Sequence, residues 1–138
     1  MKDIAYIALG SNLGQREVFL AQARRAISTL EKTRVLGQTD AEETAPIGPI
    51  AQGPFLNQMV AIETELSPQD LLAELKRIEM EAGRVRTARW GPRTLDLDII
   101  LFERQTVHEP GLTVPHPELS NRDFWLRELA ALRSARVG

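Results

Sequence analysis

Apolar residues recur at helical spacing in two stretches of the chain. In residues 15–31, one face of a helix would collect Phe19, Leu20, Ala23, Ile27 and Leu30. In residues 68–82, the corresponding stripe is Leu71, Leu72, Leu75, Ile78 and Ala82. The second stretch also has boundary signals, because Ser67 can cap a helix, Pro68 suits its first turn and Gly83 can end it. Both stretches are therefore predicted to be amphipathic helices.

The remaining apolar segments are short and have the composition or the alternation of β-strands. The predicted extended segments are residues 4–9, 33–44, 55–65, 94–102 and a short strand at 105–107. Pro and Gly make residues 45–54 a loop, residues 84–93 form a second loop, and a short helix is expected from Asn121. The order strand, helix, strand, strand, helix, strand is that of a ferredoxin-like α+β sandwich, with helices on one face of a mostly antiparallel sheet.

Composition limits the class of protein. With 138 residues, of which 43% are hydrophobic, the chain fits one domain spanning residues 1–138 with a single core. A formal charge of −2 argues against a general nucleic-acid binder, which carries a basic surplus. The absence of cysteine excludes disulfides, thiolate metal sites and thiol catalysis. No signal peptide or membrane-spanning stretch is visible, so we expect a soluble cytoplasmic domain.

Asp96 and Asp98 stand two residues apart in the predicted strand L-D-L-D-I-I-L-F. Side chains alternate along a strand, so both carboxylates lie on one face with Cα atoms roughly 6–7 Å apart. Their repulsion favours a cation between them, and Mg²⁺ suits such a site because it binds few carboxylates and completes its shell with water and phosphate oxygens. The alternative is a solvated outer face with surface salt bridges, which is the more frequent meaning of D-x-D alone.

Four arginines precede this strand within ten residues and change that balance. Arg84, Arg86, Arg89 and Arg93 lie in a predicted loop that also contains Trp90. Guanidinium groups bind phosphate through a planar fork, and loops often carry function. Ion pairs with the 19 acidic residues of the chain could instead account for all four. The clustering in one loop favours a polyphosphate substrate.

Three further polar residues are candidates for binding. Glu79 lies at the edge of the apolar stripe of the second helix and needs an arginine partner or solvent. Asn57, with Phe55 on the same face of its strand, could bind the edge of a flat heterocycle, although a structural Asn is more common. His116 stands between two prolines in V-P-H-P, without triad or metal spacing. The common phosphate-binding loops and the protein-kinase signature set are absent, so a nucleotide would be held by arginines and a metal.

Five segments together resemble one enzyme family. They are Y-I-A-L-G-S-N-L-G, T-A-P-I-G-P…F-L-N, E-M-E-A-G-R-V-R, R-W-G-P-R-T-L-D-L-D-I-I-L-F and L-T-V-P-H-P…N-R-D-F, in matching order over nearly the whole chain. The family they resemble is 6-hydroxymethyl-7,8-dihydropterin pyrophosphokinase, an enzyme of folate biosynthesis with a ferredoxin-like α+β fold. The resemblance implies transfer of pyrophosphate from ATP to the hydroxymethyl oxygen of the pterin, with release of AMP.

The resemblance also implies roles for individual residues. Asp96 and Asp98 match aspartates that bind two magnesium ions. The residues that match the ATP site are Glu79, Arg84, Arg93, Ile99, Thr113, His116 and Arg122. Those that match the pterin pocket, whose aromatic pair sandwiches the ring, are Gly10, Thr44, Ile47, Phe55, Asn57 and Phe124. Arg86 and Trp90 match a mobile loop that closes over the substrates.

Two other functions fit parts of the pattern. Ferredoxin-like sheets can bind RNA through surface aromatics and arginines, but only 5% of the residues are aromatic and the RNP1 pattern is absent. A metal-dependent phosphohydrolase could use the same aspartates without a pterin acceptor. The whole series of motifs favours a magnesium-dependent pyrophosphokinase, which we expect to act as a monomer on ATP and the pterin, without nucleic-acid or membrane partners.

Overall fold

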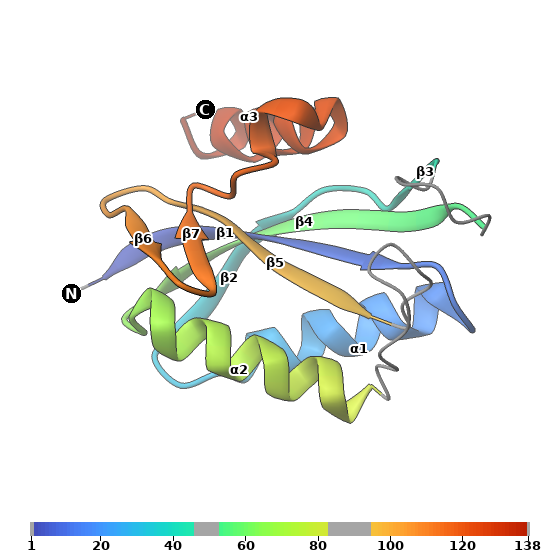
Figure 1. Cartoon of the computed structure of the whole chain (residues 1–138), viewed down its shortest axis with the longest axis horizontal. Helices are drawn as coiled ribbons and strands as arrows, with labels where there is room; N and C mark the ends of the chain where they lie inside the picture. The colour runs from blue at the N-terminus through green and yellow to red at the C-terminus, as the bar shows by residue number, and fades with distance from the viewer. Residues whose placement is uncertain (1, 46–52, 83–94, 138) are drawn as a thin grey trace.

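A mainly antiparallel sheet forms the centre of the protein, and helices cover both of its faces (Figure 1). The structure is a computed structural model that describes residues 2–45, 53–82 and 95–137. Within these ranges the sheet consists of β1 (Asp3–Ser11), β2 (Thr33–Gln38), β3 (Glu42–Thr44), β4 (Phe55–Thr64) and β5 (Asp96–Phe102). The other elements are α1 (Arg16–Ser28), α2 (Pro68–Glu81), β6 (Val107–Glu109), β7 (Leu112–Val114), the 3-10 helix η1 (Leu119–Asn121) and α3 (Asp123–Val137).

The strand order is β2-β4-β1-β5, and β3 pairs with the first residues of β4. These pairings are antiparallel, so the predicted ferredoxin-like α+β sandwich is confirmed. The helices α1 and α2 share one face of the sheet, as predicted, and α3 lies on the opposite face (Figure 1). The hairpin β6–β7 forms a separate small sheet beside β5.

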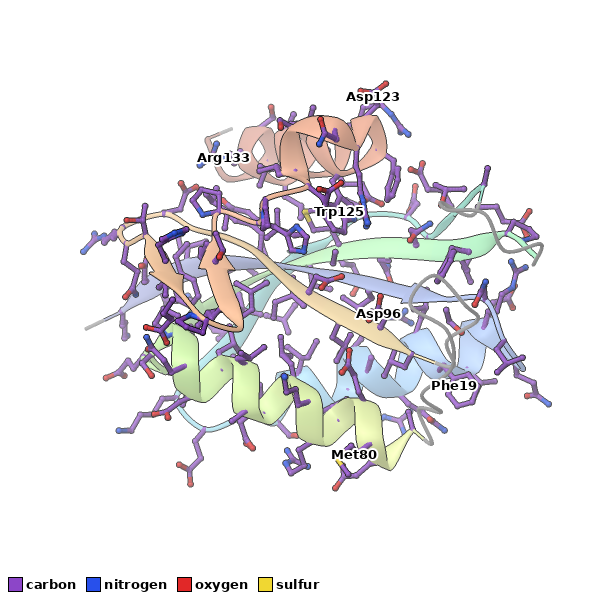
Figure 2. All side chains as sticks on the ribbon, viewed as in Figure 1. Phe19, Met80, Asp96, Asp123, Trp125 and Arg133 are labelled. Atoms are coloured by element: carbon purple, nitrogen blue, oxygen red, sulfur yellow. The ribbon has the colours of Figure 1, made fainter. Side chains whose placement is uncertain are left out.

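The central strand β1 separates two hydrophobic cores. Because successive side chains of a strand point to opposite faces, Ala5, Ile7 and Leu9 pack with α1 and α2. Tyr6 and Ala8 pack on the other side with α3, whose buried apolar residues are Trp125, Leu129 and Leu132. Burial on both faces explains why the segment I-A-Y-I-A-L is apolar throughout and does not alternate. Figure 2 shows Trp125 pointing from α3 toward the sheet.

Several elements differ in extent from the sequence prediction. The extended segment 33–44 is two strands, β2 and β3. Both pair with β4, but the register shifts by one residue between the pairs Gln38–Val60 and Glu42–Asn57. The short strand predicted at 105–107 begins at Val107, and β7 was not predicted. The pair Pro110-Gly111 makes the connecting turn, in which Gly111 has a φ of 83° that favours glycine. The C-terminal helix is long because its apolar stripe packs on the sheet.

The start of α2 is as the sequence predicts. The Ser67 side chain accepts a hydrogen bond from the backbone N–H of Asp70 at 3.0 Å, and Pro68 occupies the first turn. This bond satisfies one of the backbone donors that a helix leaves unpaired at its N-terminus. No helix in the described ranges is both long and apolar enough to cross a membrane.

Removing this cap is expected to weaken the protein without changing its fold. Ser67→Ala should lower the free energy of unfolding by about 1 kcal/mol, because the Asp70 N–H loses its acceptor. Urea denaturation followed by circular dichroism measures the loss. Ser134→Ala, on the exposed side of α3, is the control and should change stability by less than about 0.5 kcal/mol. Equal effects of the two substitutions would contradict the capping role.

Candidate functional site

A row of residues crosses three neighbouring strands on the sheet face that α3 covers. Asp96 of β5 lies opposite Gly10 of β1, and Gly10 lies opposite Asn57 of β4. Residues that are directly opposite in antiparallel strands share a face of the sheet. We call Asp96, Gly10 and Asn57 the polar row. Asp98 is on the same face, because it pairs with Ala8, whose side chain packs with α3.

The two aspartates therefore share a face, as predicted. Their neighbours Leu95, Leu97 and Ile99 are buried on the opposite face with α1 and α2. The side chain of Asp98 is 33% exposed, so it is in contact with solvent. Asp96, labelled in Figure 2, is also partly exposed near the start of β5. This arrangement places both carboxylates on one partly exposed face, while the strand itself is anchored in the core.

His116 lies next to these aspartates. Its Nε2 is 3.7 Å from Asp98 Oδ1, and its backbone N–H donates to the carbonyl of Ile100 at 2.8 Å. Its Nδ1 accepts the backbone N–H of Glu118 at 3.0 Å. A neutral imidazole that accepts at Nδ1 carries its proton on Nε2. His116 therefore presents an N–H donor toward the carboxylate side of the site.

Trp125 fixes several predicted site residues, a role that the sequence analysis missed. Its buried ring meets the edge of the His116 ring with centroids 4.9 Å apart. The Arg122 guanidinium carbon lies 4.2 Å from the Trp125 ring centroid, and the Phe124 ring lies 5.9 Å away. The sequence signal was the helical spacing of Trp125 with the apolar residues of α3. The Trp125 ring thus contacts two residues that the resemblance assigns to the ATP site, His116 and Arg122. It also contacts Phe124, which the resemblance assigns to the pterin pocket.

Arg122 also has an unused donor. Its Nε is buried and has no hydrogen-bond partner among the residues described. A buried donor without an acceptor is unfavourable, and an anionic ligand would satisfy it. This orphan N–H fits the phosphate-binding role that the resemblance implies.

Glu79 is 5% exposed and holds the strand that carries the aspartates. Its Oε2 accepts the backbone N–H of Leu97 at 2.7 Å, and Leu97 stands between Asp96 and Asp98. The sequence predicts an arginine partner or solvent for this carboxylate; the residue is instead buried, and one of its partners is the backbone amide of Leu97. The bond ties α2 to β5 at the point where the aspartates project.

At the other end of the polar row, Asn57 lies beside Thr44 and Gly10. The Asn57 amide donates to the Thr44 hydroxyl of β3. A methyl group built on Gly10 would lie 3.2 Å from Asn57 Oδ1 and 3.5 Å from Phe55 Cδ1. Glycine at position 10 therefore leaves room for both side chains, and the adjacent Phe55 is only partly buried.

The other predicted site residues are placed differently or lie outside the described residues. The side chain of Ile99 is buried in the core on the opposite face, so only its backbone could meet a nucleotide there. Thr113 is half-buried on β7, opposite His108. The predicted residues outside the described ranges are Ile47, Arg84, Arg86, Trp90 and Arg93.

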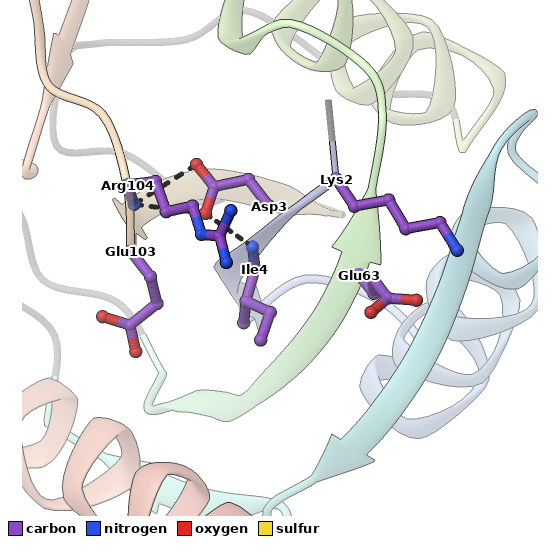
Figure 3. Close-up of a pocket in the computed structure, with 6 residues that line it drawn as sticks. All are labelled: Lys2, Asp3, Ile4, Glu63, Glu103 and Arg104. Atoms are coloured by element: carbon purple, nitrogen blue, oxygen red, sulfur yellow. Dashed lines mark hydrogen bonds between the residues drawn. The ribbon is translucent and has the colours of Figure 1, made fainter.

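A hollow of about 380 Å³ lies at the far end of β1 and contains none of the predicted site residues (Figure 3). Asp3 is one of its lining residues. The Asp3 carboxylate accepts the backbone N–H groups of Ile4 at 2.7 Å and Arg104 at 3.1 Å, and the Gln105 amide at 3.1 Å. These bonds give Asp3 a structural role, tying the start of β1 to the turn after β5.

Comparison with known proteins identifies the family. Residues 6–134 match the model of the 7,8-dihydro-6-hydroxymethylpterin-pyrophosphokinase family. The chain belongs to this family. Its activity is the transfer of the pyrophosphoryl group from ATP to hydroxymethyldihydropterin in folate biosynthesis, EC 2.7.6.3. The resemblance seen in the sequence is confirmed, and neither an RNA-binding module nor a phosphohydrolase is supported.

Individual relatives agree with this assignment. The chain is 46% identical over 132 residues to the 2-amino-4-hydroxy-6-hydroxymethyldihydropteridine pyrophosphokinase of Bacillus subtilis, covering 96% of this chain and 79% of that protein. It is 46% identical over 133 residues to the enzyme of the same name from Haemophilus influenzae, covering 96% and 83%. The fold resembles the Plasmodium falciparum HPPK-DHPS crystal structure with pteroate, with a TM-score of 0.62 and 13% identity, over 91% of this chain and 38% of that one.

The bond from Glu79 to β5 gives a prediction about stability. Glu79→Leu should lower the free energy of unfolding by about 1–3 kcal/mol, because the buried Leu97 N–H loses its acceptor. Glu79→Gln keeps a side-chain oxygen and should lose less. Chemical denaturation measures both, with Glu81→Leu on the exposed end of α2 as the control. If Leu and Gln at position 79 have the same effect, the acceptor is not what matters.

Proposed function

We propose that this pyrophosphokinase binds ATP on the β5 side of the polar row and the pterin on the β4 side, so that the pyrophosphoryl group crosses β1. The observation that supports this assignment is the register itself. It sets Asp96 and Asn57 on either side of Gly10, on one face of three adjacent strands. On the described strands, Thr44, Phe55 and Asn57, which match the pterin pocket, thereby lie on one side of Gly10, and the aspartates that match the magnesium ligands lie on the other.

The aspartates fit a magnesium site. They are two carboxylates on one face, partly exposed, and no group of three or more potential metal ligands occurs among the described residues. Such a sparse set suits Mg²⁺, which takes one or two carboxylates and fills its shell with water and substrate phosphate oxygens. When bound, Mg²⁺ neutralises the triphosphate and polarises the phosphorus that is attacked. We propose that Asp96 and Asp98 hold two such ions.

The remaining residues on this side bind and orient the triphosphate. The Nε2–H of His116 and the orphan Nε–H of Arg122 are donors that phosphate oxygens accept. Arg84 and Arg93 act as further phosphate ligands, and Arg86 and Trp90 close over the substrates to exclude water; these four roles rest on the family resemblance. Phosphoryl-type transfer depends mainly on positioning and charge neutralisation, so no covalent nucleophile is required.

On the β4 side, the residues around Asn57 bind the pterin. Because the Asn57 NH₂ donates to Thr44, its Oδ1 faces the ligand as an acceptor for a ring N–H. The family resemblance supports a sandwich of the heterocycle between the aromatic rings of Phe55 on β4 and Phe124 on α3, and a role for Ile47 in the pterin pocket. The hydroxymethyl oxygen then points along the row toward Asp96 and attacks the β-phosphorus of ATP, and the bond to AMP breaks.

The other properties of the enzyme follow from this assignment. We propose that residues 1–138 act as one catalytic domain and that the enzyme works as a monomer. It consumes ATP, which the cytoplasm supplies. Its partners are the two substrates, and it needs neither nucleic acid nor membrane.

Product identity tests this proposal. With ATP, Mg²⁺ and 6-hydroxymethyl-7,8-dihydropterin, the protein should form one AMP per pterin converted, and chelation of the metal by EDTA should stop turnover. Asp96→Asn and Asp98→Asn should each lower kcat by about 100-fold or more with an unchanged circular dichroism spectrum, because the metal loses an anionic ligand. Asp70→Asn, exposed on α2, is the control. Release of ADP, or AMP formation without the pterin, would exclude the proposed reaction.

Gly10 provides a test of the pterin side. Gly10→Ala should raise the KM for the pterin several-fold and leave the KM for ATP nearly unchanged, because the added methyl group displaces Asn57 and Phe55. Gly37→Ala is the matched control, since its methyl group would meet Leu132 at an ordinary 3.7 Å. Steady-state kinetics with each substrate varied in turn measures both constants. A rise in the KM for ATP alone would place the pterin elsewhere.

A further inference from the structure

Glu128 of α3 is a buried acid that the proposed chemistry does not use. The residue is only 4% exposed. Both of its carboxylate oxygens are buried and have no hydrogen-bond partner among the residues described. An ionised carboxylate in such a place is strongly unfavourable, whereas the neutral acid is tolerated more easily.

The position of Glu128 in the helix explains its burial. Trp125, Leu129 and Leu132 form the stripe of α3 that packs on Tyr6, Ala8 and neighbouring side chains of the sheet. Glu128 falls within this stripe, three residues after Trp125 and four before Leu132. It occupies a site where an apolar side chain would be expected.

The nearby charges do not neutralise it. The acidic neighbour is Glu42 of β3, and the basic one is Arg127 of α3, which donates to both Glu42 oxygens at 3.1 and 3.3 Å. On the face of β4 that α3 covers, Asn57, Met59 and Ala61 carry no charge, and Glu63 is paired with Arg34. From β1 and its surroundings, Tyr6 bonds Glu103, which is itself paired with Arg133. The other ionisable groups described on this face are Asp96, Asp98 and His116, which lie toward the polar row, and Arg122, which stacks on Trp125.

These surroundings make Glu128 sensitive to pH. Burial, and then the charge of Glu42, raise the pKa of the Glu128 carboxyl from 4.5 to about 7. The unfolded chain therefore releases this proton at lower pH than the folded protein does. The contribution of this group to the free energy of unfolding is therefore largest below about pH 4.5. It decreases as the pH rises from about 4.5 to about 7 and is constant above that.

The helix that carries Glu128 also carries site residues. Phe124 lies one turn before Glu128 on α3, and Arg122 immediately precedes the helix and stacks on Trp125. We propose that Glu128 is a positioning residue: in its neutral form it lets α3 pack on the sheet with Phe124 and Arg122 at the substrate site, and in its charged form it loosens that packing. The effect on substrates rests on the proposed function, whereas the effect on α3 does not.

The test compares the wild-type protein with Glu128→Gln, which has nearly the same shape and is neutral at every pH. Thermal unfolding and steady-state kinetics are measured between pH 5 and 8.5. We expect the difference between the Tm of the variant and that of the wild type to increase in favour of the variant as the pH rises to about 7, and to be constant at higher pH. The wild-type KM for the pterin should rise several-fold relative to that of the variant as the pH passes through about 7, where the carboxyl of the folded protein ionises, with kcat changing less. A Tm difference and a KM ratio that are both independent of pH would overturn the proposal.

A control and a direct measurement complete the experiment. Glu65→Gln, exposed after β4, should give wild-type pH dependence. If Glu128→Gln does not fold, carbon-13 NMR of the wild-type carboxyl groups still decides, because Glu128 should titrate near pH 7 and an ordinary acidic midpoint would refute the idea. Glu42→Gln should lower that midpoint. If the wild-type Tm falls with rising pH relative to the variant but no pterin is converted at any pH, the effect on α3 is supported and the proposed function is overturned instead.

Discussion

The register of β1 between β4 and β5 is the constraint on which the rest of the site depends. It fixes which residues of three strands share a face, and side chains on a strand repeat every second residue. A shift of β5 by one residue would turn Asp96 and Asp98 into the core and bring Leu97 to the surface. The two hydrophobic cores prevent such a shift, since Leu97 and Ile99 are buried on one face and Ile100 on the other. The bond from Glu79 to the Leu97 amide secures the same register locally.

The second element of the site is α3, which packs on the face of the sheet that carries the polar row and brings Phe124 and the preceding Arg122 to it. Its register on the sheet is set by Trp125, whose ring meets His116, Arg122 and Phe124. These residues come from a loop, a helix boundary and a helix, so their relative positions depend on packing rather than on strand pairing. The site therefore combines a row fixed by backbone hydrogen bonds with a cover fixed by side-chain contacts. The second kind of contact is the more easily altered, as the buried Glu128 illustrates.

Much of this could be predicted from local sequence patterns. Alternation placed Asp96 and Asp98 on one face, Ser67 and Pro68 marked the start of α2, and the order of elements indicated the fold. The features that could not be predicted depend on contacts between distant segments. Nothing near Glu79 in the chain indicates that its partner is the Leu97 amide, and the face of the sheet that α3 covers is decided by Tyr6 and Ala8, far earlier in the chain. Glu128 was missed because a single acid in a helix ordinarily faces solvent.

The polar row also sets a length scale. Neighbouring strands lie about 4.8 Å apart, so a span from β5 across β1 to β4 measures about 10 Å. That spacing belongs to the backbone and is the same for every sequence that forms the sheet. If the two substrates bind on either side of Gly10, the spacing of the strands fixes the distance between their binding positions. Side-chain changes could then alter which heterocycle or nucleotide is accepted, but the distance over which the group is passed is built into the strand spacing.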